Sequence, residues 1–159
     1  MLLDRLELEG FRGFGTPFAI SFAGPLTVLV GENGTGKSAV IDAIRLILHT
    51  DEFGRAPLTE GDFHKPFDPG GKQSGLLTIR AHFADLTDTE QVVFLPWTDA
   101  DDTASLTLTA EKPTGSSGRL KRTLWGGASS SSMFEWELMD SIDCVYLPPL
   151  RDAEARLRE

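Results

Sequence analysis

The sequence predicts an α/β fold in which a mixed sheet packs against a helix, and three observations lead to this class. An apolar run, Pro25–Val30, ends at a glycine and is typical of a strand buried on both faces of a parallel sheet. From about Lys37 to His49 the apolar period changes from two to about 3.6 residues, which predicts a helix packed on that sheet. Alternating segments between residues 75 and 125 predict an antiparallel β subdomain.

The chain opens with a predicted hairpin. Leu6 and Leu8 alternate with acidic residues, and a turn rich in glycine follows at Gly10–Phe14. A second alternating segment then runs from Phe18 to Phe22. Two half-buried strands are therefore expected before the apolar run.

The predicted helix has an apolar stripe on one face, made of Val40, Ile41, Ile44, Ile47 and Leu48. Glycine, proline and charged residues dominate Thr50–Gly75, which predicts a long irregular segment with one helical turn near Leu58–Phe63. Loops of this length are usually functional or face a partner.

Four further strands are expected in the β subdomain, and they form an antiparallel meander: Gly75–Phe83, Gln91–Pro96, Ser105–Ala110 and Arg119–Leu124. Ile142–Leu147 predicts another short buried strand, and Leu150–Glu159 begins a helix for which no stop signal follows. We thus expect a core in residues 1–50, the β subdomain in 75–125, and a core strand with the start of a helix in 142–159. The uncapped helix suggests a piece of a longer protein.

Charge and composition exclude several functions. The chain of 159 residues carries 15 basic and 24 acidic side chains, a net charge of −9, so bulk charge does not favour nucleic acid or an anionic membrane. Any DNA partner is expected to bind regions outside this chain.

The single cysteine, Cys144, excludes an intramolecular disulfide and is expected to be a small core residue. No apolar run approaches the roughly 18 residues that span a bilayer, and the acidic start is unlike a secretory signal, which predicts a cytoplasmic protein.

One motif carries the chemistry. Gly31–Ser38 matches G-x-x-x-x-G-K-[ST] in full and lies between the predicted buried strand and the helix, which is the context that the motif requires. Its glycines allow successive N–H groups to point into one concavity at a helix N-terminus, and this arrangement binds polyphosphate. Lys37 supplies a charge for the β and γ phosphates, and Ser38 supplies an oxygen ligand for Mg²⁺. The pattern predicts a nucleotide site.

Other candidates are weaker. The three histidines, His49, His64 and His82, show no metal-ligand spacing. The basic residues between 119 and 122 are more typical of a solvated strand face than of a nucleic-acid site. No predicted strand ends in an acidic residue that could complete a Mg²⁺ shell, so the residues that hydrolyse a nucleotide are missing from the chain.

Two segments together resemble a known family. Leu6–Phe14, followed by Gly31–Ser38 and Ile41–Ile44, resembles the N-terminus of ABC-type ATPases of the SMC and RecF group. More narrowly, Leu58–Phe63 and Val145–Glu154 resemble the OLD (overcoming lysogenization defect) nucleases, which couple such an ATPase to a C-terminal Toprim nuclease.

The resemblance implies ATP and Mg²⁺ as cofactors and roles for individual residues. Arg12 would lie against the nucleotide, Asn33 near the γ-phosphate, Lys37 on the phosphates and Ser38 on Mg²⁺. The full set of residues expected to bind the cofactor is Arg12, Gly31, Asn33, Gly34, Thr35, Gly36, Lys37 and Ser38. The family's glutamine loop has no match, and its role is absent or passes to Arg151 or Asp152.

The expected function is therefore that of the ATP-binding lobe of an OLD-type ATPase, which would dimerise and cut DNA in the full-length protein. Its acidic metal-shell strand, signature loop, switch histidine and nuclease carboxylates are absent here, so no catalytic residue is assigned and little hydrolysis is expected. A RecF- or SMC-like repair ATPase without nuclease activity is the first alternative. A non-catalytic module that dimerises on binding nucleotide is the second, and a small-molecule kinase is the least favoured.

Overall fold

The computed structural model describes eight stretches of the chain: residues 1–22, 24–48, 50–51, 54–55, 58–99, 102–113, 119–131 and 134–147. The helix expected at 150–159, His49 and the loop tip at 115–118 lie outside these residues. Within the described part, no helix is both long and apolar enough to cross a membrane.

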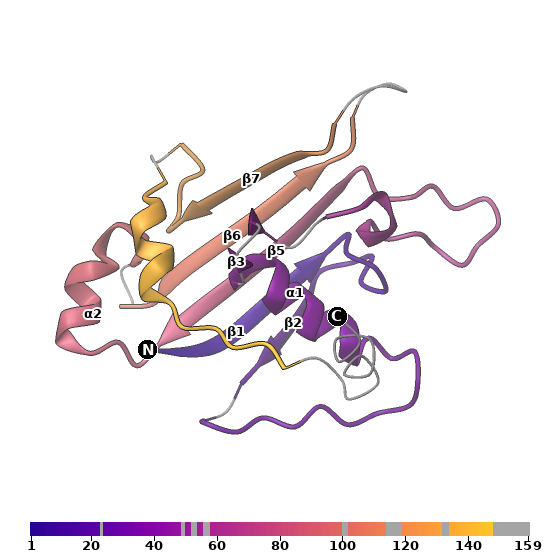
Figure 1. Ribbon diagram of the computed structural model, residues 1–159. Coiled ribbons are helices and arrows are strands. Elements are labelled where there is room, and N and C mark those ends of the chain that lie inside the picture. Colours follow the sequence, from indigo (N-terminus) through magenta and orange to yellow (C-terminus); the bar gives the residue numbers. More distant parts are fainter. Residues whose placement is uncertain are drawn as a thin grey trace, which may run out of the picture.

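A five-stranded antiparallel sheet dominates the fold (Figure 1). Its strands are arranged in the order β2-β1-β5-β6-β7: β2 (Phe18–Ser21), β1 (Leu2–Glu9), β5 (Leu76–Ala84), β6 (Ala104–Glu111) and β7 (Lys121–Gly126). The predicted hairpin is confirmed, and so are three of the four strands predicted for the antiparallel meander. The two parts join in one sheet because β1 pairs with β5. A separate two-stranded pair consists of β3 (Thr50–Asp51) and β4 (Gly54–Arg55).

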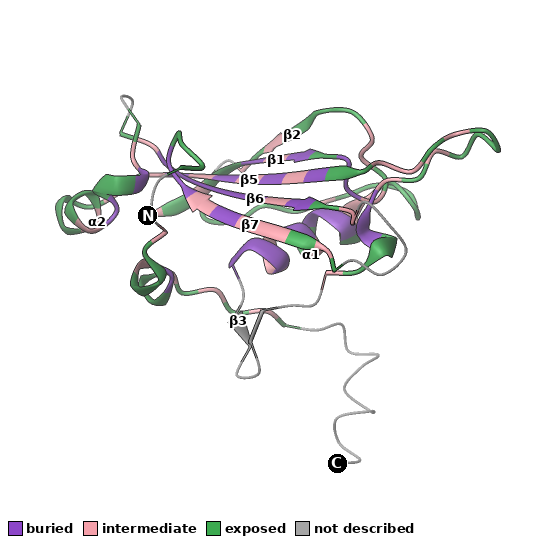
Figure 2. Cartoon of the chain, turned by 90° about the horizontal axis from the view of Figure 1, so that it is seen from above, coloured by how far each residue is buried: buried purple, intermediate pink, exposed green. Residues whose placement is uncertain are grey.

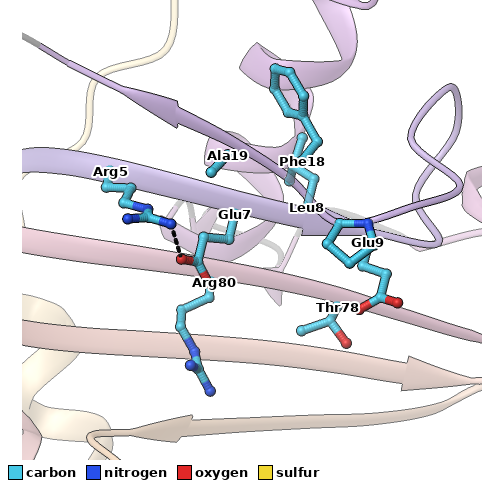
Figure 3. Close-up of a pocket in the computed structure, with 9 residues that line it drawn as sticks. Arg5, Glu7, Leu8, Glu9, Phe18, Ala19, Thr78 and Arg80 are labelled. Atoms are coloured by element: carbon cyan, nitrogen blue, oxygen red, sulfur yellow. Dashed lines mark ion pairs between the residues drawn. The ribbon is translucent and has the colours of Figure 1, made fainter.

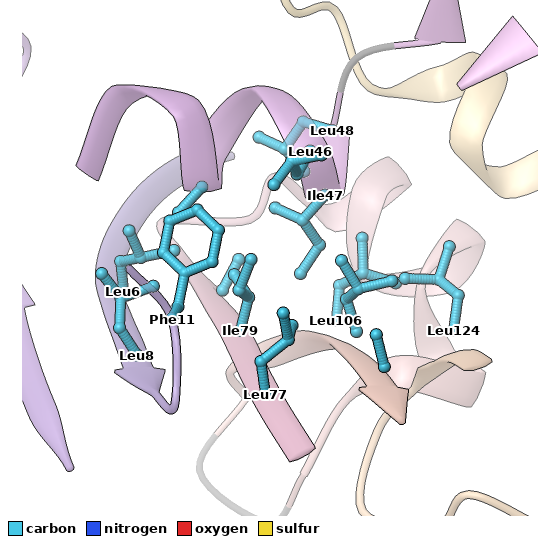
Figure 4. Close-up of a cluster of buried hydrophobic side chains, with 14 of the residues drawn as sticks. Leu6, Leu8, Phe11, Leu46, Ile47, Leu48, Leu77, Ile79, Leu106 and Leu124 are labelled. Carbon is cyan, nitrogen blue, oxygen red and sulfur yellow. The ribbon is translucent and has the colours of Figure 1, made fainter. Parts of the chain in front are cut away.

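Helix α1 (Lys37–Leu48) covers one face of the sheet and forms the core with it (Figures 2 and 4). Fully buried leucines and isoleucines of β1, β5 and β6 face the helix: Leu6, Leu8, Leu77, Ile79, Leu106 and Leu108. The helix buries Val40, Ala43 and Ile47, whereas Ile41 of the predicted stripe is 43% exposed. The helix is as expected, with its buried stripe rotated slightly from the predicted one.

The strand predicted at Gln91–Pro96 is wrong. This segment forms α2 (Asp88–Val93) and the short 3-10 helix η2 (Leu95–Trp97). Thr87 caps α2, because its hydroxyl accepts from Glu90 N (3.3 Å) while Glu90 Oε2 accepts from Thr87 N (2.7 Å). This capping box outweighs the β propensity of the valines that follow. The other 3-10 helices are η1 (Glu60–Asp62), at the predicted helical turn, and η3 (Trp136–Ser141).

The strands predicted at Pro25–Val30 and Ile142–Leu147 are also absent. Both segments are extended, yet within the described residues neither pairs with a strand. Several of their apolar side chains are exposed, with Val30 88% and Val145 85% accessible, whereas Leu29, Ile142 and Cys144 are partly buried. Buried parallel strands need neighbours in the sheet, and the described sheet offers them none.

The segment from Ile142 to Leu147 runs along α1 on the side away from the sheet (Figure 2). Its side chains alternate, because Ile142 and Cys144 pack against the core and the Tyr146 ring lies 4.7 Å from the Arg45 guanidinium carbon. Cys144 is half-buried, and burial raises the pKa of its thiol. The segment predicted as a strand thus packs only one of its two faces against the rest of the molecule.

The first residue is tied to α2, which gives a prediction on pH. Met1 N donates to Glu90 Oε2 (2.8 Å), and this hydrogen bond and those from Thr87 lower the Glu90 pKa from 4.5 to about 2. Because the folded-state pKa is depressed, the stabilisation is present above pH 4.5 and is lost as the pH falls toward 2. We expect Glu90→Gln to lower Tm at pH 7 and to match the wild type near pH 2, measured by thermal melts across this range. A difference in Tm that stays constant with pH would contradict it.

Candidate functional site

The loop Gly31–Ser38 connects the extended segment 25–30 to the start of α1. Gly34 and Gly36 have φ of +86° and +95°, a conformation that side chains rarely adopt, so glycine is required at both places. Thr35 closes a turn on Glu32, since its N and Oγ1 donate to the Glu32 carbonyl at 3.4 and 2.9 Å. The motif therefore adopts a tight turn at a helix N-terminus.

Phe14, from the connection between β1 and β2, packs on this loop. A Cβ at Gly36 would lie 2.7 Å from the Phe14 ring, which in turn stacks on Phe18 with ring centroids 4.6 Å apart. Gly36 is thus required for both its backbone angle and the close approach of the ring. The glycine turn Gly10–Phe14 and the loop, about twenty residues apart in the sequence, meet here.

Lys37 lies in the first turn of α1, and its side chain folds back over the loop. Nζ donates to the carbonyls of Gly31 (2.7 Å) and Glu32 (2.6 Å). Asn33 and Ser38 are exposed beside it. The structure therefore brings the predicted lysine, serine and asparagine together at one helix end, with the lysine hydrogen-bonded to the loop itself.

A hollow of about 390 Å³ adjoins the loop. Gly31, Thr35, Gly36 and Lys37 line it, together with apolar residues of the hairpin, of the preceding segment and of α1: Phe14, Phe18, Ile20, Val28, Leu29, Val30 and Val40. A larger hollow of about 490 Å³ lies on the sheet face opposite α1 (Figure 3). Its two arginines are matched by two glutamates, and Arg5 pairs with Glu7 at 2.9 Å. Only the first hollow combines a cation with a helix N-terminus.

These residues fit a nucleoside triphosphate with Mg²⁺. The turn presents backbone N–H groups at the positive end of α1, and the lysine and serine supply a cation and a hard oxygen ligand. No group of three or more metal-ligating side chains occurs in the described stretches, so a cation here would rely on Ser38 and the phosphates. Arg151 and Asp152 lie outside the described residues.

Arg12, which the resemblance places against the nucleotide, is held by two carboxylates. Nε donates to Asp62 Oδ1 (2.9 Å), and Nη1 donates to Asp42 Oδ2 on α1. Burial lowers the pKa of Arg12, but the hydrogen bonds and charges of Asp62 and Asp42 raise it more, so the net shift is upward. The side chain is 37% exposed and stays charged.

From the sequence, no role is assigned to Asp42 or Asp62, whose carboxylates accept hydrogen bonds from Arg12. A signal for Asp62 existed, since Thr59 and Asp62 form a capping box at η1, with Thr59 N donating to Asp62 Oδ2 (2.8 Å). The sequence offered no signal that the carboxylates of Asp42 and Asp62 would meet at one arginine. His64, considered above as a metal ligand, instead lies with Nδ1 2.7 Å from the Arg12 carbonyl oxygen.

Comparisons with known proteins agree with this geometry. Residues 5–123 match the family model described as AAA domain. The chromosome partition protein Smc of Halothermothrix orenii is 52% identical over 48 residues, and that of Bacillus subtilis is 44% identical over 48 residues. Each alignment covers 30% of this chain and 4% of the relative, so the chain spans only a small part of these proteins.

Solved structures show the same fold. A chain from a study titled "Structural biochemistry of ATP-driven dimerization and DNA stimulated activation of SMC ATPases" has a TM-score of 0.55 and 24% identity, covering 87% of this chain and 75% of that one. The SMC head domain of Thermotoga maritima has a TM-score of 0.50 and 23% identity, covering 80% and 38%. The fold is that of the P-loop ATPase heads of SMC proteins, and by its family match over residues 5–123 the chain belongs to the AAA domain family.

Proposed function

We propose that the chain is the ATP–Mg²⁺-binding lobe of an ABC-type ATPase related to SMC heads. The observation that carries this is the glycine turn of Gly31–Ser38 at the start of α1, with Lys37 folded over it. The loop N–H groups and Lys37 would hold the β and γ phosphates, Ser38 would bind Mg²⁺, and Asn33 would lie near the γ-phosphate. Transfer of the γ-phosphoryl group of ATP to water, with ADP as the leaving group, would drive the larger protein.

Binding requires Lys37 to exchange partners. Its two hydrogen bonds to loop carbonyls are between a charged donor and neutral acceptors. A phosphate oxygen is a charged acceptor, so it adds an attraction between opposite charges that a neutral carbonyl does not provide. The ammonium group would therefore leave the carbonyls for the phosphates, and the loop would open around them.

Hydrolysis is proposed to need residues beyond this chain. Within the described stretches, β1 ends at Glu9, but this side chain lines the hollow on the sheet face opposite α1, and no group of three or more metal-ligating side chains occurs. Exposed apolar side chains on the two extended segments support the addition of further strands: Leu26, Val28, Val30, Val145 and Leu147. The complete ATPase would contain those strands and would form an ATP-dependent homodimer.

The wider role has two candidates. Leu58–Phe63 and Val145–Glu154 resemble OLD nucleases, which supports an ATPase that controls a Toprim DNA endonuclease. The Smc relatives, named as chromosome partition proteins, favour an SMC- or RecF-like ATPase without nuclease activity. In both cases DNA would bind outside this acidic chain.

The test measures binding and turnover separately. We expect calorimetry to detect weak, Mg²⁺-dependent ATP binding to residues 1–159, while phosphate release stays at background. Turnover in this chain that disappears in Lys37→Ala would contradict the proposed division of labour. Incubating the full-length protein with supercoiled DNA and Mg²⁺ separates the two roles, because cleavage supports the nuclease and ATP-dependent DNA binding without cleavage supports its alternative.

A further inference from the structure

The glycine turn Gly10–Phe14 holds a strained arginine. Arg12 has φ of 45°, in the left-handed region. Gly10 and Gly13 lie in the same turn, and glycine adopts this conformation more easily than arginine does. Such strain persists only where the surroundings enforce it, and it clusters at functional sites. The strained backbone at Arg12 therefore points to a functional role for its side chain.

Residues 62–64 fix the backbone of the turn. Arg12 N donates to the Asp62 carbonyl (2.8 Å), His64 N donates to the Gly10 carbonyl (2.7 Å), and His64 Nδ1 lies 2.7 Å from the Arg12 carbonyl. Residues 62–64 thus contact the backbone on both sides of Arg12, and the turn cannot relax without breaking these hydrogen bonds.

The two carboxylates hold the guanidinium in different ways. Asp62 is 6% exposed, and its second oxygen is fixed by Thr59 N (2.8 Å) and Thr59 Oγ1 (3.0 Å). The Asp42 side chain is 28% exposed and projects from α1. Asp62 is therefore a rigid anchor for Nε, whereas Asp42 is a more mobile acceptor for Nη1. Within the described part of the chain, Nη2 makes no hydrogen bond.

Asp42 also lies close to the proposed nucleotide site. Ser38 and Asp42 are four residues apart on α1, and side chains at this spacing are neighbours, with Cβ atoms about 5–6 Å apart. The guanidinium of Arg12 is thus one helical turn from the residue proposed to bind Mg²⁺. The guanidinium is planar, so it moves as one group, and a pivot about the hydrogen bond from Nε to Asp62 would carry Nη1 and Nη2 from Asp42 toward the phosphates.

On these contacts we propose that Asp62 is a positioning residue for Arg12 and that Asp42 competes with the nucleotide for it. With ATP bound, Asp62 keeps Nε while Nη1 and Nη2 turn from Asp42 to the outermost phosphate. This inference rests on the proposed ATP site, and it assigns the two aspartates opposite effects on affinity.

The test compares charge-removing variants of similar shape. We expect Asp42→Asn to tighten ATP–Mg²⁺ binding and Asp62→Asn to weaken it, each by about three- to fivefold, the size of a partly exposed ion pair. ADP binding should change less, because it lacks the outermost phosphate. Glu7→Gln, which removes a carboxylate from the Arg5 pair on the opposite sheet face, is the matched control and should change neither affinity.

In calorimetry, the deciding result is whether the two variants change the affinity for ATP–Mg²⁺ in opposite directions. A general loss of negative charge would tighten ATP binding in both variants, and a loss of structure would weaken it in both, so either result overturns the inference. The Asp42→Asn gain should also vanish in an Arg12→Ala background, and a gain that persists there overturns it as well. Asp42 is on the surface of α1, so its variant keeps the test valid even if Asp62→Asn fails to fold. Absence of Lys37-dependent ATP binding in the wild type would instead refute the proposed function.

Discussion

Lys37→Ala is expected to lower the affinity for ATP–Mg²⁺ by about ten- to a hundredfold. The substitution removes the one side-chain cation of the loop, and a hydrogen bond to a charged group is worth about 1.5–3 kcal/mol, with each 1.4 kcal/mol a factor of ten. The backbone N–H groups and the positive end of α1 remain, so weak binding should persist. Calorimetric titration with ATP and Mg²⁺ measures the change.

Lys121→Ala is the matched control for this variant. Lys121 lies on the edge strand β7 with its side chain 73% exposed, 3.9 Å from Glu111, and its loss removes the same charge from a residue that does not line the hollow beside the loop. Its affinity for ATP should equal that of the wild type. An affinity of Lys37→Ala within twofold of the control, in a protein with unchanged Tm, would show that the loop does not bind phosphate as proposed.

Leu106→Ala is expected to destabilise the chain by about 2–5 kcal/mol, because it leaves a cavity at a fully buried position. Leu106 lies in β6 between Ala81 of β5 and Gly126 of β7, and its side chain belongs to the core below α1 (Figure 4). At roughly 2–4 °C per kcal/mol for a chain of this size, Tm should fall by about 5–15 °C. Thermal and urea unfolding followed by circular dichroism measure both quantities.

Val145→Ala provides the contrast. Val145 has the apolar character of a buried strand residue, but it is 85% exposed. Its truncation should change the free energy of unfolding by no more than about 0.5 kcal/mol. A loss as large as that of Leu106→Ala would mean that the segment 142–147 is packed as the sequence pattern predicts.

Local sequence patterns were sufficient to predict the elements whose packing partners lie among the described residues. The 3.6-residue period predicted α1, and alternation predicted β1, β5, β6 and β7, because each finds its partners among the described strands. The strand prediction for Gln91–Pro96 was wrong for a local reason, since the apolar residues suggested a strand while Thr87 and Glu90 form a helix cap. That capping box was readable in the sequence and was missed.

For two segments, apolar runs proved a weaker guide to secondary structure than alternation did. Pro25–Val30 and Ile142–Leu147 have the composition of buried strands, yet burial is a property of the neighbours and not of the segment. The strand predictions for both segments are therefore wrong, because no described strand lies beside either of them to pair with.

The sequence by itself determined the loop that we propose to bind phosphate, because the spacing of glycines, lysine and serine over eight residues is a local property of the backbone. The tertiary structure alone decided the surroundings of Arg12. Asp42 and Asp62 are 30 and 50 residues away along the chain, and only the packing of α1 and η1 against the glycine turn brings both carboxylates to one guanidinium. Contacts of that kind depend on how elements pack, which no local pattern encodes.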